Sequence, residues 1–270
     1  MTLSYLRNIL FLSHLFALSV RCQGLAFSGE AITTRFWDCC KPSCGWKQKA
    51  PFSRPVLSCG IDEKPLDIAA GTGCNGGNAY LCSDQQPWVV NETFSYGFAG
   101  IFLPGHNEDF WCCSCYQLDF TSDPLRGKSM IVQASNTAYD INTANRFSLA
   151  VPGGNTTSYD ACAKQYGVDQ TVFGENHRGV GSKEDCDGLP QQLQPGCRWR
   201  YDWFQDASYP SANFKRVVCP AELTDRTLCK RNDEKALAEG GSSSAAPTSS
   251  SPASFRAGAL AVIIAALLSA

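Results

Sequence analysis

The chain has 270 residues, of which 18% are charged, and its formal net charge at pH 7 is -2. It has no basic stripe of the kind that binds a phosphate backbone, so nucleic acid is excluded as a partner. The length is sufficient for one domain with its own hydrophobic core.

The first 24 residues have the pattern of a secretory signal peptide. Arg7 precedes the apolar run ILFLSHLFALSV, and small or polar residues follow between Cys22 and Gly24. This segment is too short and wrongly flanked to span a membrane. The alternative, a buried N-terminal helix, is disfavoured because the segment is not amphipathic at the helical period.

Residues 25–235 are expected to form a single, mainly β domain rich in loops. Short runs with β-branched and aromatic residues predict strands, namely SMIVQAS, RFSLAVPG, RWRYDWF and FKRVVC. The segments SYDACAKQYG and KEDCDGLPQQL predict short helices, the second with Ser182 as its N-cap.

The cysteines favour a disulfide framework in an oxidising compartment. Of the 15 cysteines, Cys22 lies in or beside the signal peptide, which leaves an even 14. A zinc site is disfavoured because His14 lies in the signal peptide and because His106 and His177 lack ligand spacing. We therefore expect neither a metal nor a cofactor.

Two sequons and the C-terminal end complete the expected organisation. Asn91 and Asn155 begin N-x-T sequons and are expected to be glycosylated in surface loops. Residues 236–256 are Gly-, Ser- and Pro-rich, which is typical of a stalk. Residues 257–270, AGALAVIIAALLSA, are too short for a spanning helix and resemble a GPI-attachment tail, with the anchor near Ser243–Ala246. A plain hydrophobic tail or a single-pass anchor is the alternative.

Several segments carry a resemblance to a known family. The stretch TTRFWDCCKPSCGW resembles the signature of glycoside hydrolase family 45, the small fungal endoglucanases. DQQPWVVN, GFAG, WCCSCYQLDFTS, AVPGG, CRWRYDWF and RVVCPAELTDRTLCKRND resemble further family segments in the same order, so the likeness covers nearly all of residues 31–234. It implies a six-stranded double-psi β-barrel with long disulfide-linked loops and short helices.

The resemblance also implies a disulfide connectivity, which spacing alone does not provide. The implied pairs are Cys39–Cys162, Cys40–Cys74, Cys44–Cys112, Cys59–Cys82, Cys113–Cys229, Cys115–Cys219 and Cys186–Cys197.

For the chemistry, the resemblance implies inverting hydrolysis of a β-glucan. This reaction needs one carboxyl group to activate water and a second to protonate the leaving oxygen. Asp38 matches the general base of the family. Thr34, Phe36, Trp46 and Arg146 match positions that bind substrate, although Phe36 stands where many relatives have tyrosine and aromatic residues can instead belong to the core.

The expected general acid is missing. In the segment NRFSLAVPGG, Ser148 stands where the family has its catalytic aspartate, and a serine hydroxyl is far too weak an acid for this task. Asp140 is the best substitute acid, although a guanidinium such as that of Arg146 beside it would favour its ionised form. The alternative for Asp140 is a solvated loop carboxylate.

Two functions therefore remain open at this point. The first is a secreted or surface-anchored endo-β-1,4-glucanase acting on cellulose or a related glucan, with reduced activity or a relocated acid. The second is a catalytically impaired protein that binds glucan or modifies cell walls. In both cases we expect an extracellular monomer whose only membrane contact is a GPI anchor.

Overall fold

The computed structural model describes residues 27–139, 142–155 and 160–241. The signal-peptide segment, the hydrophobic tail, most of the stalk and Asp140 lie outside these residues. Within the described ranges, none of the helices has the length and apolar character needed to cross a bilayer.

Six strands close into a β-barrel. Each strand pairs with the next in the order β5, β7, β6, β9, β1, β8, and β8 returns to pair with β5. The strands are β1 (Ser28–Phe36), β5 (Phe94–Phe102), β6 (Cys115–Phe120), β7 (Ser129–Thr137), β8 (Arg146–Ala150) and β9 (Ser211–Val217). The predicted six-stranded barrel is confirmed.

Parallel and antiparallel pairs are mixed in this barrel. β5 with β7 and β1 with β8 are parallel, and the other neighbours are antiparallel. Strand β4 (Trp88–Asn91) extends the sheet along the first half of β5, and β2 (Ser58–Cys59) and β3 (Tyr80–Leu81) form a separate small sheet. Parallel partners need long connections, which is why the chain carries extended loops between its strands.

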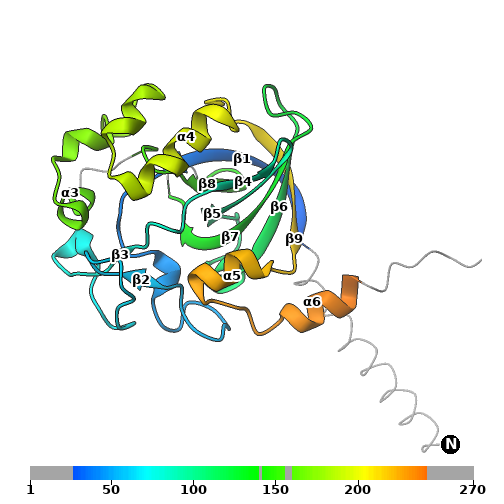
Figure 1. The fold of residues 1–270 in the computed structure, drawn as a ribbon. Helices are drawn as coiled ribbons and strands as arrows, with labels where there is room; N and C mark the ends of the chain where they lie inside the picture. Colours follow the sequence, from blue (N-terminus) through cyan, green and yellow to red (C-terminus); the bar gives the residue numbers. More distant parts are fainter. Residues whose placement is uncertain (1–26, 140–141, 156–159, 242–270) are drawn as a thin grey trace, which may run out of the picture.

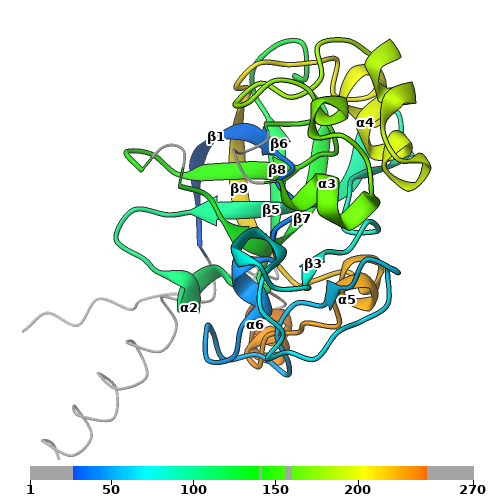
Figure 2. The ribbon, with the colours of Figure 1, turned by 90° about the vertical axis from the view of Figure 1, so that its left-hand side faces the viewer.

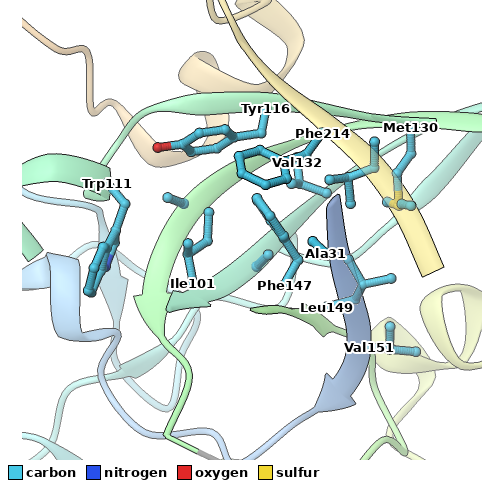
Figure 3. Packing of buried hydrophobic residues seen from close by; sticks show 14 of the residues in the cluster. Ala31, Ile101, Trp111, Tyr116, Met130, Val132, Phe147, Leu149, Val151 and Phe214 are labelled. Atoms are coloured by element: carbon cyan, nitrogen blue, oxygen red, sulfur yellow. The ribbon is translucent and has the colours of Figure 1, made fainter. Parts of the chain in front are cut away.

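The barrel interior is a packed apolar core. Figure 3 shows Phe147 and Leu149 of β8 gathered with Ile101 and Phe214 from other strands. Side chains alternate between the two faces of a strand, so Ser148 lies on the outer face of β8. All five residues of β8 are nevertheless buried, because loops cover this outer face. The side chain of Ser148 is therefore buried on the outer face of the barrel and does not belong to the apolar core inside it.

Short helices surround the barrel. Figures 1 and 2 show α4 (Gln194–Asp202) near the top of the domain and α5 (Ala221–Thr227) and α6 (Glu234–Gly241) below the barrel, while α3 (Ala161–Tyr166) lies beside it, at the left in Figure 1. The short helix α2 (Glu108–Trp111) follows β5. Helix α6 includes the first six residues of the expected stalk, since the buried side chain of Leu237 holds it against the domain.

The four predicted strands had different outcomes. SMIVQAS, RFSLAVPG and FKRVVC supply β7, β8 and β9, as predicted. The strand predicted at RWRYDWF is wrong, because these residues mostly belong to helix α4. The same letters also satisfy a helical spacing, since Trp199 and Trp203 lie four residues apart and stack with ring centroids 5.4 Å apart.

Both predicted helical segments form helical structure. SYDACAKQYG contains α3, and KEDCDGLPQQL forms two 3₁₀ turns, Glu184–Gly188 and Gln191–Leu193. The hydroxyl oxygen of Ser182 accepts the N–H of Asp185 at 3.3 Å, which is a capping contact at the start of this segment.

Seven disulfides cross-link the loops and short elements around the barrel, and one of them, Cys115–Cys219, includes a residue of barrel strand β6. They are the seven pairs that the family resemblance implied. Five of them join residues at least 34 positions apart in sequence, so they connect loops that no local hydrogen bond links. Such long-range bridges restrict the unfolded chain most strongly.

Candidate active site

A cavity of about 230 Å³ lies where β1 and β7 end, beside β8. Because β1 and β8 are parallel and Thr34 pairs with Ser148, the segment that follows β1 runs past Ser148. The parallel pairing of β5 with β7 delivers the end of β7 to the same place. The cavity is lined by Arg35, Phe36, Asp38, Asn136, Thr137, Ala138, Tyr139, Ser148, Asn155 and His177.

Asp38 is held rigidly at this cavity. It is the second residue after β1, and the next residue, Cys39, has a left-handed backbone with φ of 57°. That conformation is uncommon for a non-glycine residue, and a disulfide to Cys162 holds it in place. Cys40 is also bridged, to Cys74, and its N–H donates to Asp38 Oδ1 at 3.0 Å. The carboxylate is therefore oriented by covalently fixed backbone.

Burial governs the protonation of this carboxylate. Desolvation raises the pKa of Asp38 above its ordinary value, and the hydrogen bond from the Cys40 N–H opposes the rise without cancelling it. A carboxylate with a raised pKa is a stronger base than one in water. Among the described residues that line the cavity, Asp38 alone carries a carboxyl group.

Ser148 lies on the cavity wall and is almost fully buried. It pairs with Thr34 on one side and with Gly100 on the other. A Cβ atom at Gly100 would lie only 3.2 Å from the backbone carbon of Thr137, so this glycine allows the end of β7 to approach the wall. The hydroxyl of Ser148 can accept or donate a hydrogen bond here, but it cannot supply a proton to an alkoxide leaving group.

The other predicted site residues are distributed differently. Phe36 lines the cavity with Asp38. Thr34 is buried and lines an adjoining hollow of about 40 Å³, which shares Arg35 and Asn155 with the cavity. Asp140, the predicted substitute acid, is outside the described residues.

Two residues expected to bind substrate do not line the cavity. Arg146 is 0% exposed at the start of β8 and is not among the residues that line the cavity. Trp46 is half-buried, and the Lys41 amine stands 3.7 Å from its ring centroid. That amine donates to the carbonyl oxygens of Ile68 and Ala70, so the ring face that it covers belongs to a structural contact.

The structure adds residues that motif reasoning missed. Asn136, Tyr139, Asn155 and His177 all line the cavity, and Tyr139 is 77% exposed. Asn155 is also the asparagine of the second sequon, so a glycan attached to it would lie beside the cavity. None of the four belongs to the cysteine-rich signature, and apart from the sequon at Asn155 no local pattern marks them as cavity residues.

Metal binding has no structural support in the described ranges. No group of three or more His, Cys, Asp or Glu side chains there is arranged to hold a metal ion. The chemistry available at this cavity is that of a desolvated carboxylate, an imidazole, a phenol and amide groups.

Comparison with known proteins provides an independent view of this arrangement. The sequence model described as Glycosyl hydrolase family 45 matches residues 29–230. A protein of Fusarium oxysporum named "Putative endoglucanase type K" is 42% identical over 214 residues, which are 78% of this chain and 56% of that protein. An endoglucanase of Cryptopygus antarcticus is 42% identical over 205 residues, covering 76% of this chain and 90% of that protein.

A solved structure is similar in fold as well. The crystal structure of the cellulase from the Antarctic springtail Cryptopygus antarcticus superimposes with a TM-score of 0.72 at 41% sequence identity. The match covers 76% of this chain and 99% of the springtail chain.

Proposed function

The chain belongs to glycosyl hydrolase family 45, and on that premise we propose that it is an endo-β-1,4-glucanase. Its substrate is cellulose or a related β-glucan, in which it hydrolyses internal β-1,4-glucosidic bonds. The similar proteins named endoglucanases and the springtail cellulase support this assignment.

The observation that carries the proposal is the placement of Asp38. Its carboxylate is desolvated, fixed by bridged backbone and exposed to a cavity. In an inverting reaction such a group removes a proton from water, which attacks the anomeric carbon from the face opposite the leaving group. Asp38 is the general base of this proposal, and Phe36 is a substrate contact beside it.

Ser148 favours a second candidate function. With a hydroxyl in place of the family acid, the protein would bind a glucan chain or modify a wall without efficient cleavage. Both functions use the same cavity and its polar wall, so they differ only in whether the bound glucan is cleaved.

The test is hydrolysis by the secreted protein, expressed from the full chain. Reducing ends are measured on soluble β-1,4-glucan and on mixed-linkage glucan, with Asp38→Asn and the exposed Asp160→Asn compared in parallel. Hydrolysis that survives Asp160→Asn but not Asp38→Asn supports the glucanase. Glucan binding in an affinity gel with no new reducing ends in any variant would instead favour the second function.

We further propose an extracellular, monomeric protein attached to the membrane by a GPI anchor. Seven disulfides support an oxidising compartment. A phosphatidylinositol-specific phospholipase should release the protein from cells, and sedimentation should give the mass of one chain. Retention on membranes from which a known GPI protein is released would refute the anchor.

A further inference from the structure

The predicted substitute acid, Asp140, lies outside the described residues, and the described part of the cavity contains another proton donor with suitable chemistry. Besides Asp38, the described lining residues whose side chains carry a cationic N–H or a hydroxyl proton are Arg35, Thr137, Tyr139, Ser148 and His177, and the threonine hydroxyl is as weak an acid as that of serine. A guanidinium stays protonated, a phenol has an ordinary pKa of about 10 and a serine hydroxyl is weaker still. An imidazolium, with an ordinary pKa of about 6.5, gives up its proton in the range where extracellular hydrolases work.

We propose that His177, in its protonated form, is the general acid of this enzyme and replaces the aspartate that Ser148 has displaced. The inference rests on the proposed glucanase function. It concerns a residue that sequence reasoning considered only as a metal ligand.

The turn that carries His177 is firmly attached to the cavity wall. Glu175 and Gly179 exchange backbone hydrogen bonds of 2.8 and 3.1 Å, and the N–H of Val180 donates to the carbonyl oxygen of Gly153 at 3.0 Å. A Cβ atom at Gly179 would lie 2.2 Å from that same oxygen, so the two backbones are in close contact. The Gly153 turn directly follows β8, which carries Ser148. His177 is therefore anchored next to the strand that holds the family acid position.

The backbone at His177 is itself unusual. Its φ is 61°, in the left-handed region that histidine, asparagine and aspartate tolerate better than most residues. The side chain is exposed and lines the cavity, so the imidazole can exchange its proton with solvent between turnovers.

Asp38 and His177 enter the cavity from different segments. Asp38 reaches the cavity from the end of β1, and His177 reaches it from the turn docked after β8. The cavity has a volume of about 230 Å³, so it has room for a water molecule and a glycosidic oxygen. An inverting reaction needs its acid and its base on opposite faces of the sugar, which two separate segments can supply.

The groups near the imidazole carry mixed charges. Arg35, Asp38 and Tyr139 line the same cavity, while Arg178 and Glu175 on its own turn pair with each other at 3.4 Å. The Arg35 guanidinium donates to the carbonyl oxygen of Ala207 at 2.7 Å. The cavity wall therefore carries one cation and one anion besides the imidazole.

The proposed step balances without a further reactant. His177 gives its proton to the glycosidic oxygen while the bond from that oxygen to the anomeric carbon breaks. Asp38 takes a proton from water, whose oxygen forms the new bond to the anomeric carbon. The leaving sugar departs as an alcohol, and solvent returns the proton from Asp38 to the imidazole.

The test uses His177→Asn, because asparagine also tolerates the left-handed backbone. The neighbouring and exposed Arg178→Gln is the matched control. Each full-length protein is assayed on soluble β-1,4-glucan and on an aryl β-cellobioside with a nitrophenolate leaving group, which departs without a proton. We expect a fall in kcat of roughly 10²- to 10⁴-fold on glucan and less than about 10-fold on the aryl substrate, with an unchanged control.

The pH profile provides a second readout. In the wild type, activity on glucan should decline at alkaline pH as the acid loses its proton, and His177→Asn should abolish that limb. Equal losses on both substrates, or no loss on glucan, overturn the assignment. If either of these outcomes is found while the wild type is active and Asp38→Asn is inactive, the role of His177 is refuted and the glucanase function is retained. A wild type without hydrolysis refutes both.

Discussion

Replacing Asp38 by asparagine or by alanine should separate its catalytic role from its structural role. Asparagine retains an oxygen that can accept the Cys40 N–H, which now donates to Asp38 Oδ1 at 3.0 Å, but it cannot take a proton from water. We expect a roughly 10²- to 10⁴-fold loss of kcat, or about 3–5 kcal/mol in the activation barrier.

The same substitution should stabilise the fold. Burial raises the pKa of Asp38, so the folded state binds this proton more tightly than the unfolded state. Stability is therefore lost as the pH rises through the folded pKa, and the penalty is fully present above that pKa. Asparagine carries no charge, so its advantage over the wild type should grow as the pH rises through the folded pKa and should vanish below about pH 4.

Alanine provides the contrast that makes the reasoning testable. It leaves the Cys40 N–H without its acceptor, which costs about 1–3 kcal/mol for a buried donor and about 1 kcal/mol here, where Cys40 is half-buried. Guanidinium chloride unfolding at pH 7 should rank Asp38→Asn above Asp38→Ala by that amount. A ranking in the opposite order, or more than a tenth of wild-type hydrolysis in Asp38→Asn, would refute this reading of the site.

Three further outcomes follow from the structure. Excess reductant should abolish near-ultraviolet dichroism under mild conditions, since removal of each native bridge in a small secreted domain typically costs about 2–5 kcal/mol; a retained signal would contradict this. Burial tends to raise the pKa of Asp233, but hydrogen bonds from Arg216 and Arg231 hold it below its usual value. Asp233→Asn should therefore lower the free energy of unfolding by about 3 kcal/mol at pH 7, and the difference should shrink as the pH falls through that lowered pKa; a pH-independent difference would argue against it. Ser148→Asp in the His177→Asn background should restore activity on glucan at least 10-fold at acidic pH, and no recovery in a folded variant would show that this wall position does not reach the leaving oxygen.

Local sequence patterns predicted the secondary structure correctly where the residues fitted the side-chain periodicity of only one element type. The segments of β7, β8 and β9 combine β-branched and aromatic residues in short runs, and they are strands. RWRYDWF satisfies both the strand period and the i, i+4 helical spacing. The choice of helix there depends on packing, because Trp199 stacks on Trp203 and the preceding cysteine is bridged to Cys186.

The connectivity of the cysteines has a different origin. The even number of cysteines in the mature chain indicates disulfides, but seven bridges among 14 cysteines allow very many pairings. The pairs came from the family resemblance, and the structure has the same seven. Spacing could not supply them, because most of the bridges join residues that meet only after the barrel closes.

The candidate site shows the same division. The sequence by itself determined that Asp38 stands directly before two adjacent cysteines, and its resemblance to the family implied that Ser148 stands at the acid position. Only the tertiary structure decided that Arg146 is fully buried and that His177 shares a cavity with Asp38. The physical reason is that local patterns determine whether a segment forms a helix or a strand. The cavity depends instead on contacts between residues far apart in the chain, namely the parallel register of β1 with β8 and the turn docked onto Gly153.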